Sequence, residues 1–345
     1  MPAITETNVM LPAITKIVLS ATGAQTIDNS TVIQSLWSEY GQIVRLELSG
    51  GTHSSVILKH IKLPDAGHHP RGWNTELSHQ RKIRSYQVET HWYEHYAAQC
   101  ANHCVVPICL AVNTLESETV LVLTDLDAAG FDIRKSRIEI NDIRACLNWL
   151  ASFHATFLNS RADGLWECGT YWHLDTRPDE LAALNDIALR KAAPLIDQKL
   201  RQCRYQTLVH GDAKLANFCF HPDSSTADSA TLNSSPRVAA VDFQYIGRGC
   251  GMKDVAYFIG SCLNEDECEA MEGQILDYYF SILINRVADK KISVNTAELE
   301  KEWRELYPVA WADFHRFIKG WSPSHWKINS YSEKLTTSVI KNLKL

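Results

Sequence analysis

The sequence predicts an α+β chain of two lobes, a small β-rich one followed by a larger and mostly helical one. Its 345 residues exceed the roughly 250 to 300 residues that a single hydrophobic core usually serves. The first third contains short, partly alternating apolar runs with glycine turns, as in a small sheet. Farther on, apolar residues recur at helical spacing. We place the small lobe at residues 1–123, a connector at 124–130 and the large lobe at 131–345.

Five apolar segments account for the predicted small sheet. They are residues 32–37, 43–48, 55–60, 104–112 and 119–123. Gly41 lies in the turn between the first two, and Gly50 with Gly51 forms the next hairpin turn. Lys59 lies inside the third segment. Because a charge in an apolar strand is costly unless it is paired, Lys59 either has a partner or extends to solvent at a sheet edge.

The most informative segments are residues 208–220 and 238–244. Asp212, Asn217 and Asp242 stand where strand-like apolar runs begin or end. An Asp that accepts a hydroxyl proton, an Asn five residues later and a second Asp after a short strand are the residues of phosphoryl transfer from Mg-ATP. His210 completes the H-x-D-x-x-x-x-N spacing, and Asp242 with Phe243 and Gln244 stands where a protein kinase has Asp-Phe-Gly.

On these two segments the chain resembles the kinase-like small-molecule phosphotransferases, the aminoglycoside phosphotransferase and choline kinase superfamily, and most closely its ecdysteroid kinase-like group. Gly211, where protein kinases carry Arg, is the mark of that superfamily. The resemblance implies a protein-kinase-like bilobal fold, ATP and magnesium as cofactors, and a small-molecule alcohol as substrate. It assigns Asp212 as the base, and Asn217 and Asp242 as the magnesium ligands.

The resemblance also implies roles in the small lobe. It lays the first hairpin over the ATP phosphates, which makes Gly41 the candidate for close backbone approach, although a single glycine between strands is more often only a turn. It assigns Lys59 to the α and β phosphates. Glu89 and Glu94 compete as the partner of Lys59, and the family spacing of aromatic residues around the glutamate favours Glu89.

The connector at 124–130 would be the hinge of such a fold. Adenine would then contact the backbones of Thr124 and Leu126 rather than their side chains. Where the ecdysteroid kinase-like group usually has Glu-Asp-Leu, this chain has Thr-Asp-Leu, which removes any role for that glutamate.

Other residues near the loop have two interpretations. Lys214 either contacts the transferred phosphoryl group or faces solvent. Asp254 near the start of a predicted helix would brace the catalytic loop in the family, and it could also cap that helix. His210 is interpreted as structural. His154, on the apolar side of a predicted helix at 143–157, is interpreted as a hydrogen-bonded core residue.

Several segments of the large lobe are predicted without a catalytic role. Residues 181–200 are predicted to be a helix interrupted near Pro194, and residues 221–236 a Ser-rich excursion between two strands of a hairpin. The aromatic loop at 164–173 has no role that the sequence determines.

Aromatic residues near the C-terminus mark the expected acceptor side. They form either a cage for an amine or an ordinary core, and a sterol-like alcohol is equally compatible. The aromatic residues are Trp303, Tyr307, Trp311, Phe314, Phe317, Trp321 and Trp326, with the carboxylates Glu302, Glu305 and Asp313.

Composition argues against several other classes. The formal net charge of −6 disfavours a nucleic-acid binder, which needs a basic face. No apolar run reaches the roughly 18 residues of a membrane span, and residues 1–20 carry no export signal, so we expect a cytoplasmic protein with reduced thiols. Cys100, Cys104 and Cys109 lack the paired C-x-x-C pattern of a zinc site. The basic stretch 61–84 is interpreted as a solvated insertion, with binding of a phosphate-bearing partner as the alternative.

Two rival functions fit parts of this pattern. A protein kinase would need the Arg after His210 and an Ala-Pro-Glu docking segment after Asp242, and both are missing. A pseudokinase would be expected to have lost Lys59, Asp212, Asn217 or Asp242, and all four are present. The pattern therefore favours a kinase of small molecules with no obligate protein partner.

Overall fold

The computed structural model describes residues 12–36, 40–62, 76–100, 103–115, 118–222 and 238–343. Most of the predicted Ser-rich excursion and part of the basic stretch 61–84 lie outside these residues. The chain divides into two compact units. The first comprises Met1–Ser78 and Pro107–Ala129, and the second His79–Val106 and Gly130–Leu345.

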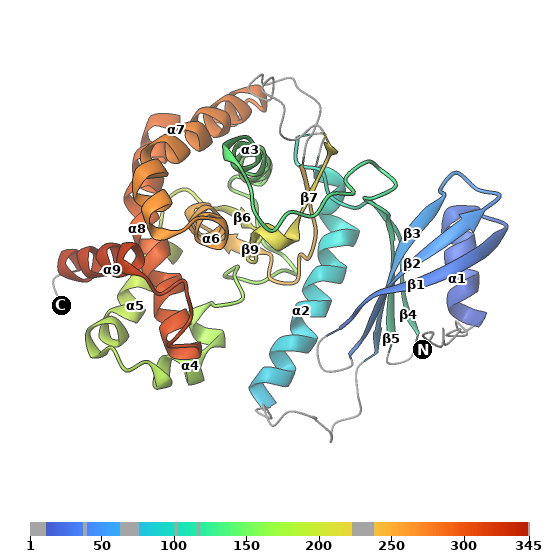
Figure 1. Ribbon diagram of the computed structural model, residues 1–345, viewed down its shortest axis with the longest axis horizontal. Helices are drawn as coiled ribbons and strands as arrows, with labels where there is room; N and C mark the ends of the chain where they lie inside the picture. The colour runs from blue at the N-terminus through green and yellow to red at the C-terminus, as the bar shows by residue number, and fades with distance from the viewer. Residues whose placement is uncertain are drawn as a thin grey trace. The chain divides into compact units, whose positions relative to one another are not determined.

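The first unit is an antiparallel sheet of five strands in the order β1-β2-β3-β5-β4, with helix α1 (Pro12–Thr22) against one face (Figure 1). Ile14 and Val18 of α1 pack into the same buried apolar cluster as Leu46, Val56 and Val120 of the sheet. The predicted small sheet is thereby confirmed. The strands are β1 (Thr26–Ser35), β2 (Gly41–Ser49), β3 (Ser55–Lys62), β4 (Cys109–Leu115) and β5 (Glu118–Thr124).

Most strand boundaries differ from the prediction by a few residues, and the starts of the first and fourth strands differ most. The first strand begins at Thr26 rather than Val32, because its early residues are polar and exposed on an edge strand and so lack an apolar alternation. The fourth begins at Cys109 rather than Cys104. Pro107 has no N–H to donate to a sheet, and Val105 before it pairs with Ala239 of the second unit instead.

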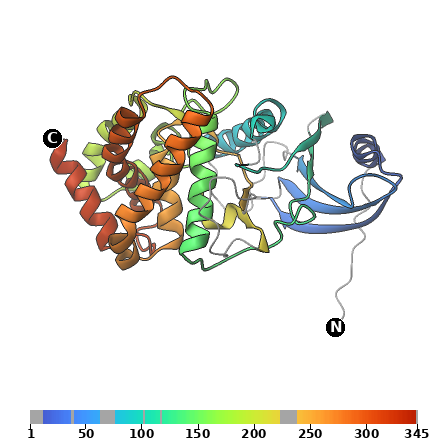
Figure 2. The same ribbon diagram turned by 90° about the horizontal axis from the view of Figure 1, so that it is seen from above.

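The second unit is mostly helical, and Figure 2 shows α3 beside α7, in agreement with their contacts. The helix predicted at 143–157 is confirmed as α3. The helices are α2 (Glu76–His95, in this unit from His79), α3 (Ile140–Thr156), α4 (Pro178–Ala183), α5 (Ile187–Arg201), α6 (Met252–Cys262), α7 (Glu265–Asp289), α8 (Thr296–Trp321) and α9 (Ser330–Asn342).

The break predicted near Pro194 was wrong. Helix α5 continues through Pro194, and Pro194 lies on the exposed face of the helix. The backbone hydrogen bond that proline cannot donate is therefore missing on the solvent side of the helix. The break lies before α5 instead, where Asp186 caps the helix by accepting a hydrogen bond from the Leu189 N–H at 3.0 Å.

Two short antiparallel strand pairs hold the two motif segments, residues 208–220 and 238–244, in place. Strand β6 (Thr207–Val209) pairs with β9 (Gly247–Gly249), and β7 (Phe218–Phe220) pairs with β8 (Val238–Ala240). The Val241 N–H also donates to the Asn217 carbonyl at 3.0 Å. The predicted juxtaposition of Asn217 and Asp242 at the ends of two paired strands is thereby confirmed.

Among the helices that the structure describes, none is both long and apolar enough to cross a membrane. All ten cysteines fall within the described residues, and none of them takes part in a disulfide bond.

Candidate active site

His210 positions the loop that carries Asp212. Its imidazole is fully buried and its Nε2–H donates to the Val241 carbonyl at 3.0 Å, which leaves Nδ1 to accept from the Asp212 N–H at 3.3 Å. The ring therefore bridges the backbone before Asp242 to the backbone of Asp212, as expected of a structural histidine.

Gly211 is required by the shape of this loop. Its φ is +80°, in the left-handed region, and a Cβ at this position would lie 2.1 Å from the Tyr245 carbonyl oxygen. The Gly211 carbonyl accepts from the Tyr171 N–H at 3.1 Å. The residue type that separates this chain from protein kinases is thus imposed by close backbone packing.

Asp254 braces the same loop from the first turn of α6. Its buried carboxylate accepts hydrogen bonds from the backbone N–H groups of His210 (2.6 Å) and Gly211 (3.0 Å). His154 donates to it through Nε2–H at 3.1 Å and accepts from the Tyr279 hydroxyl at 2.7 Å. The bracing role is confirmed, whereas the N-cap of α6 is Gly251 rather than Asp254.

Asp212 keeps one carboxylate oxygen available. Its Oδ2 accepts from the Lys214 ammonium at 2.8 Å and from the Asn217 amide nitrogen at 3.2 Å. Its Oδ1 is buried and has no hydrogen-bond partner among the described residues. Burial raises the pKa of Asp212 above its ordinary value and the Asp242 charge adds to this, although Lys214 opposes both.

Asn217 and Asp242 supply further oxygen atoms beside Asp212. The Asn217 amide nitrogen donates to the Asp212 carbonyl at 2.8 Å, so its amide oxygen is the atom left to bind a ligand. Asp242 has a left-handed backbone with φ of +70°, and its Oδ1 is buried without a partner in the described part of the chain. Such a set of oxygen donors fits magnesium.

Phe243 and Gln244, which follow Asp242, are both locked in place. The Phe243 ring is fully buried and stacks on Trp92 of α2 with centroids 4.8 Å apart. The Gln244 side chain accepts from the Lys82 ammonium at 2.7 Å, and its carbonyl accepts from the Trp166 indole at 2.8 Å. The contacts of Gln244 with α2 and the 164–173 loop gave no signal in the sequence.

Lys59 and the two competing glutamates differ in burial. Lys59 is 4% exposed on β3, which lies between β2 and β5, so the alternative of a lysine at a sheet edge was wrong. Glu89 is buried, whereas Glu94 is exposed. Because a buried carboxylate needs a partner, burial favours Glu89. Lys59 and Glu89 lie in different units, and their pairing stays a prediction.

Gly41 has a structural reason of its own. Its φ is +124°, and a Cβ would lie 2.0 Å from the His60 carbonyl oxygen of the neighbouring strand. The first position of β2 therefore requires glycine whether or not a phosphate approaches it. Approach to phosphate stays a prediction.

The connector is anchored through Asp125, which lies between the two predicted adenine contacts. The Asp125 carboxylate accepts from Arg45 and from Ser55, each at 2.7 Å. The Thr124 N–H donates to the Ile108 carbonyl at 2.9 Å, so a backbone contact from Thr124 to adenine would use its carbonyl. The contact of Leu126 stays a prediction.

Lys327 lies near Asp212, although no sequence motif identifies it. The Lys327 ammonium lies 4.6 Å from the centre of the Tyr257 ring and 5.3 Å from that of Phe314. Burial lowers the pKa of Lys327 to about 8, against the attraction of the Asp212 carboxylate. Burial and Asp212 together raise the pKa of Tyr257 well above its ordinary value. These residues are far apart in sequence, so no local motif reveals them.

Most of the C-terminal aromatic residues form the core, as one of the two interpretations expected. Trp303, Tyr307, Trp311 and Phe317 are buried. Asp313 is also buried, and its carboxylate binds Arg316 at 2.9 Å, Lys253 at 3.5 Å and the Trp172 indole at 3.0 Å. Phe314 and Trp326 contact the Lys327 ammonium. Together with Tyr257 they form the aromatic surround of this lysine, so the chain's own ammonium occupies the place that an amine would take.

Comparison with known proteins supports the same family. The model of the ecdysteroid kinase-like family matches residues 168–292. A comparison with curated proteins gave no match. Among solved structures, an amicoumacin kinase in complex with AMP-PNP, Ca2+ and Ami is 12% identical, with 95% of this chain and 92% of that chain covered and a TM-score of 0.53.

Two further structures have a TM-score of 0.49. A microcompartment-associated aminopropanol kinase is 16% identical, with 95% of this chain and 93% of that chain covered. A choline kinase from Cryptosporidium parvum is 11% identical, with 96% and 95% covered.

The family match includes Asp212, Asn217 and Asp242. The sequence identities to the solved structures are so low that these structures show a similar fold and nothing more. The resemblance inferred from the two motif segments is confirmed: over residues 168–292 this chain matches the ecdysteroid kinase-like family, and its fold is similar to that of the amicoumacin kinase.

Proposed function

We propose that the protein is an ATP- and magnesium-dependent phosphotransferase that moves the γ-phosphoryl group to a hydroxyl of a small molecule. One observation carries the proposal. Asp212 and Asp242 each keep a buried carboxylate oxygen without a hydrogen-bond partner in the described residues. Buried polar atoms are rarely left unpaired. The free oxygen of Asp212 is therefore suited to accept a substrate proton, and that of Asp242 is suited to bind a metal ion.

Asp212 is suited to accept the proton. Lys214 and Asn217 hold its Oδ2, so Oδ1 is the oxygen that receives the proton of the acceptor hydroxyl. A raised pKa makes the buried carboxylate a stronger base than an exposed one. The proton passes to Asp212 as the acceptor oxygen bonds to phosphorus and the bond to ADP breaks.

Magnesium would be held by the Asn217 amide oxygen and the Asp242 carboxylate. When bound, it would neutralise the negative charge that develops on the phosphates. On the nucleotide side, Lys59 would contact the α and β phosphates with Glu89 as its partner, Gly41 would approach the phosphates, and Thr124 and Leu126 would contact adenine through their backbones.

The proposal is tested by a thermal shift with ATP in the presence and absence of magnesium. An ADP-release screen across alcohols, amino alcohols, sugars, aminoglycosides and sterols follows. We expect stabilisation that requires both ATP and magnesium, and ADP release with at least one alcohol. Stabilisation by ATP without turnover on any acceptor would favour a pseudokinase, and no magnesium-dependent stabilisation would contradict the proposal.

Replacing Lys214 with methionine should move the acid side of the pH–rate profile to higher pH. Asp212 must be ionised to accept a proton, so the rate falls as pH drops through its pKa. Lys214 holds that pKa down against burial, and without the ammonium the pKa rises further. Lys334→Met, at an exposed ion pair with Glu269, is the control. A lower rate with an unchanged profile would instead assign Lys214 to the phosphoryl group.

Replacing Lys327 with methionine should change acceptor selectivity. The ammonium lies in an aromatic surround near Asp212, so it should repel a cationic alcohol. In the variant, kcat/KM for a cationic alcohol such as choline should rise relative to a neutral alcohol by on the order of tenfold, since a like-charge contact costs more than about 1.4 kcal/mol. The control is Lys319→Met, because the Lys319 ammonium binds Asp186 and Glu333 instead. This variant should leave the ratio of kcat/KM for the cationic and neutral alcohols unchanged. An unchanged ratio in both would remove Lys327 from the acceptor side.

A further inference from the structure

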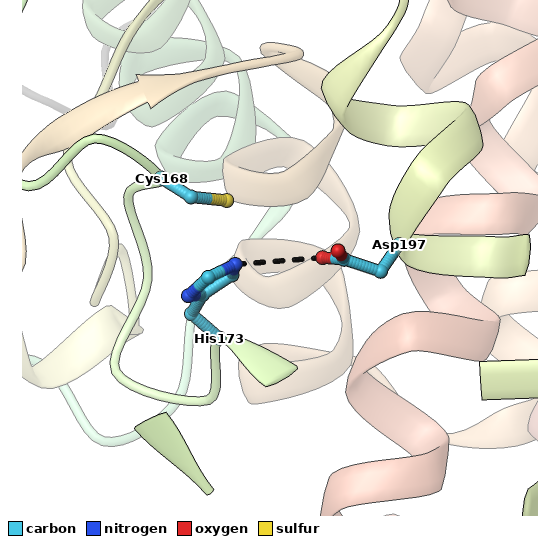
Figure 3. Close-up of side chains that lie close together, drawn as sticks. All are labelled: Cys168, His173 and Asp197. Atoms are coloured by element: carbon cyan, nitrogen blue, oxygen red, sulfur yellow. Dashed lines mark ion pairs between the residues drawn. The ribbon is translucent and has the colours of Figure 1, made fainter. Parts of the chain in front are cut away.

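Three potential metal ligands converge in the second unit, away from the proposed magnesium ligands in sequence. Cys168 and His173 come from the aromatic loop at 164–173, and Asp197 comes from α5. Figure 3 shows the three side chains pointing toward one another, and their ligand atoms all lie within 4.8 Å of each other. All three are buried, with 6% to 8% of each residue exposed.

We propose that Cys168, His173 and Asp197 bind a zinc-class divalent metal ion. The spacing of the atoms supports this. His173 Nε2 and Asp197 Oδ1 are 3.5 Å apart, which exceeds the usual N–H···O distance of about 2.7 to 3.2 Å. In a tetrahedral zinc site, with Zn–N and Zn–O bonds of about 2.0 to 2.2 Å, such ligand atoms are separated by about 3.3 to 3.5 Å.

His173 Nε2 and Asp197 Oδ1 face each other as an ion pair, but the pair is too long for a good hydrogen bond. His173 Nε2 and Asp197 Oδ1 are buried and have no hydrogen-bond partner among the described residues. Each belongs to a residue more than nine-tenths buried, so solvent contributes little to either. A metal ion placed between the three side chains would satisfy both atoms at once.

The donor types select the metal. Sulfur, imidazole nitrogen and one carboxylate oxygen are ligands typical of zinc, whereas magnesium and calcium prefer oxygen alone. The thiolate and the carboxylate would balance the two charges of the ion. The Lys253 ammonium lies 3.6 Å from the Cys168 sulfur, but it also pairs with Asp313 at 3.5 Å, so its charge has a separate partner.

The competing state is an ion-pair network without a metal. Burial lowers the pKa of His173, but Asp197 and Cys168 outweigh burial and raise this pKa to about 9. Without a metal ion, a proton on the imidazole would therefore join it to the Asp197 carboxylate. Arg201 would add to this network, 3.7 Å from Asp197. That state accounts for the contact of Lys253 with Cys168, but it leaves His173 and Asp197 too far apart for a good hydrogen bond.

The ion would act on the catalytic loop by positioning. Between the two loop ligands, the Thr170 N–H donates to the Tyr245 carbonyl at 3.1 Å and the Tyr171 N–H donates to the Gly211 carbonyl at 3.1 Å. A metal that ties this loop to α5 would therefore hold the backbone that supports Asp212. The ion would have a structural role and would take no part in phosphoryl transfer.

The test is the metal content of the full-length protein, purified without chelators from zinc-supplemented cells. Elemental mass spectrometry should find about one zinc per chain. Cobalt substituted for zinc should give the intense visible bands of a tetrahedral site and a sulfur-to-cobalt charge-transfer band. Removing zinc with a chelator should lower the melting temperature, and adding Zn2+ back should restore it.

Variants locate the ion. Asp197→Asn and Cys168→Ser should each lose most of the zinc and the cobalt spectrum. Cys146→Ser, at another buried thiol on α3, should keep both. A wild-type protein that holds no zinc and shows no melting shift on adding Zn2+ would establish the ion-pair network instead. Equal zinc in wild type and in both ligand variants would place the metal elsewhere and also overturn the proposal. The wild-type measurements decide the matter even where a variant fails to fold.

Discussion

Replacing Asp212 with alanine should lower turnover by about 10²- to 10⁴-fold and leave magnesium-dependent ATP binding nearly intact. The carboxylate is proposed to accept the proton of the acceptor hydroxyl, while Asn217 and Asp242 hold the metal. Binding is measured by a thermal shift or calorimetry with ATP and magnesium, and turnover by ADP release with the best acceptor from the screen.

Asp212→Asn sharpens this experiment. The Lys214 ammonium and the Asn217 amide both donate to Asp212, and the asparagine keeps an oxygen for them while losing the base. The control is Asp277→Ala, at an exposed aspartate paired with Arg304 on the helical unit. If asparagine at 212 turns over as fast as wild type, Asp212 is not the base.

Replacing Asp242 with alanine should abolish magnesium-dependent ATP binding. The Asp242 carboxylate is the proposed charged ligand of the metal, and its Oδ1 has no other partner among the described residues. We expect the affinity for Mg-ATP to fall at least about 100-fold, which is about 2.7 kcal/mol, as measured by calorimetry at fixed magnesium.

The backbone at Asp242 calls for a second variant. Its φ of +70° is costly for alanine but tolerated by asparagine, so Asp242→Asn removes the charge without adding strain. A loss of Mg-ATP binding in both variants, with cooperative melting retained in Asp242→Asn, would assign the effect to the carboxylate. Equal loss of binding on replacing Asp212 and Asp242 would overturn the division between base and metal ligand.

The loop that carries Asp212 was predictable because its residues are neighbours in the chain. His210, Asp212 and Asn217 lie within one turn between two short strands, so their spacing alone determines which groups can meet. Asn217 precedes β7, Asp242 follows β8, and these two strands pair with each other. A strand pair joins these two segments, and the apolar runs that form it are visible in the sequence.

Other features could not be predicted from local patterns. Helix α1 is short, and the apolar residues it buries are Ile14 and Val18, too few to reveal a periodicity. The break before α5 depends on the cap at Asp186 rather than on Pro194. In both cases packing or capping outweighed the signals that the sequence displays most clearly.

The amino-acid sequence by itself determined the fold class and the proposed base and metal ligands, since these depend on periodicity and on short spacings. Only the tertiary structure decided which distant residues meet: Lys327 in the aromatic surround, and Asp197 beside Cys168 and His173. The physical reason is that such contacts join separate helices and loops. Their partners are selected by how buried surfaces pack and by how buried charges are paired, and neither leaves a period or a fixed spacing along the chain.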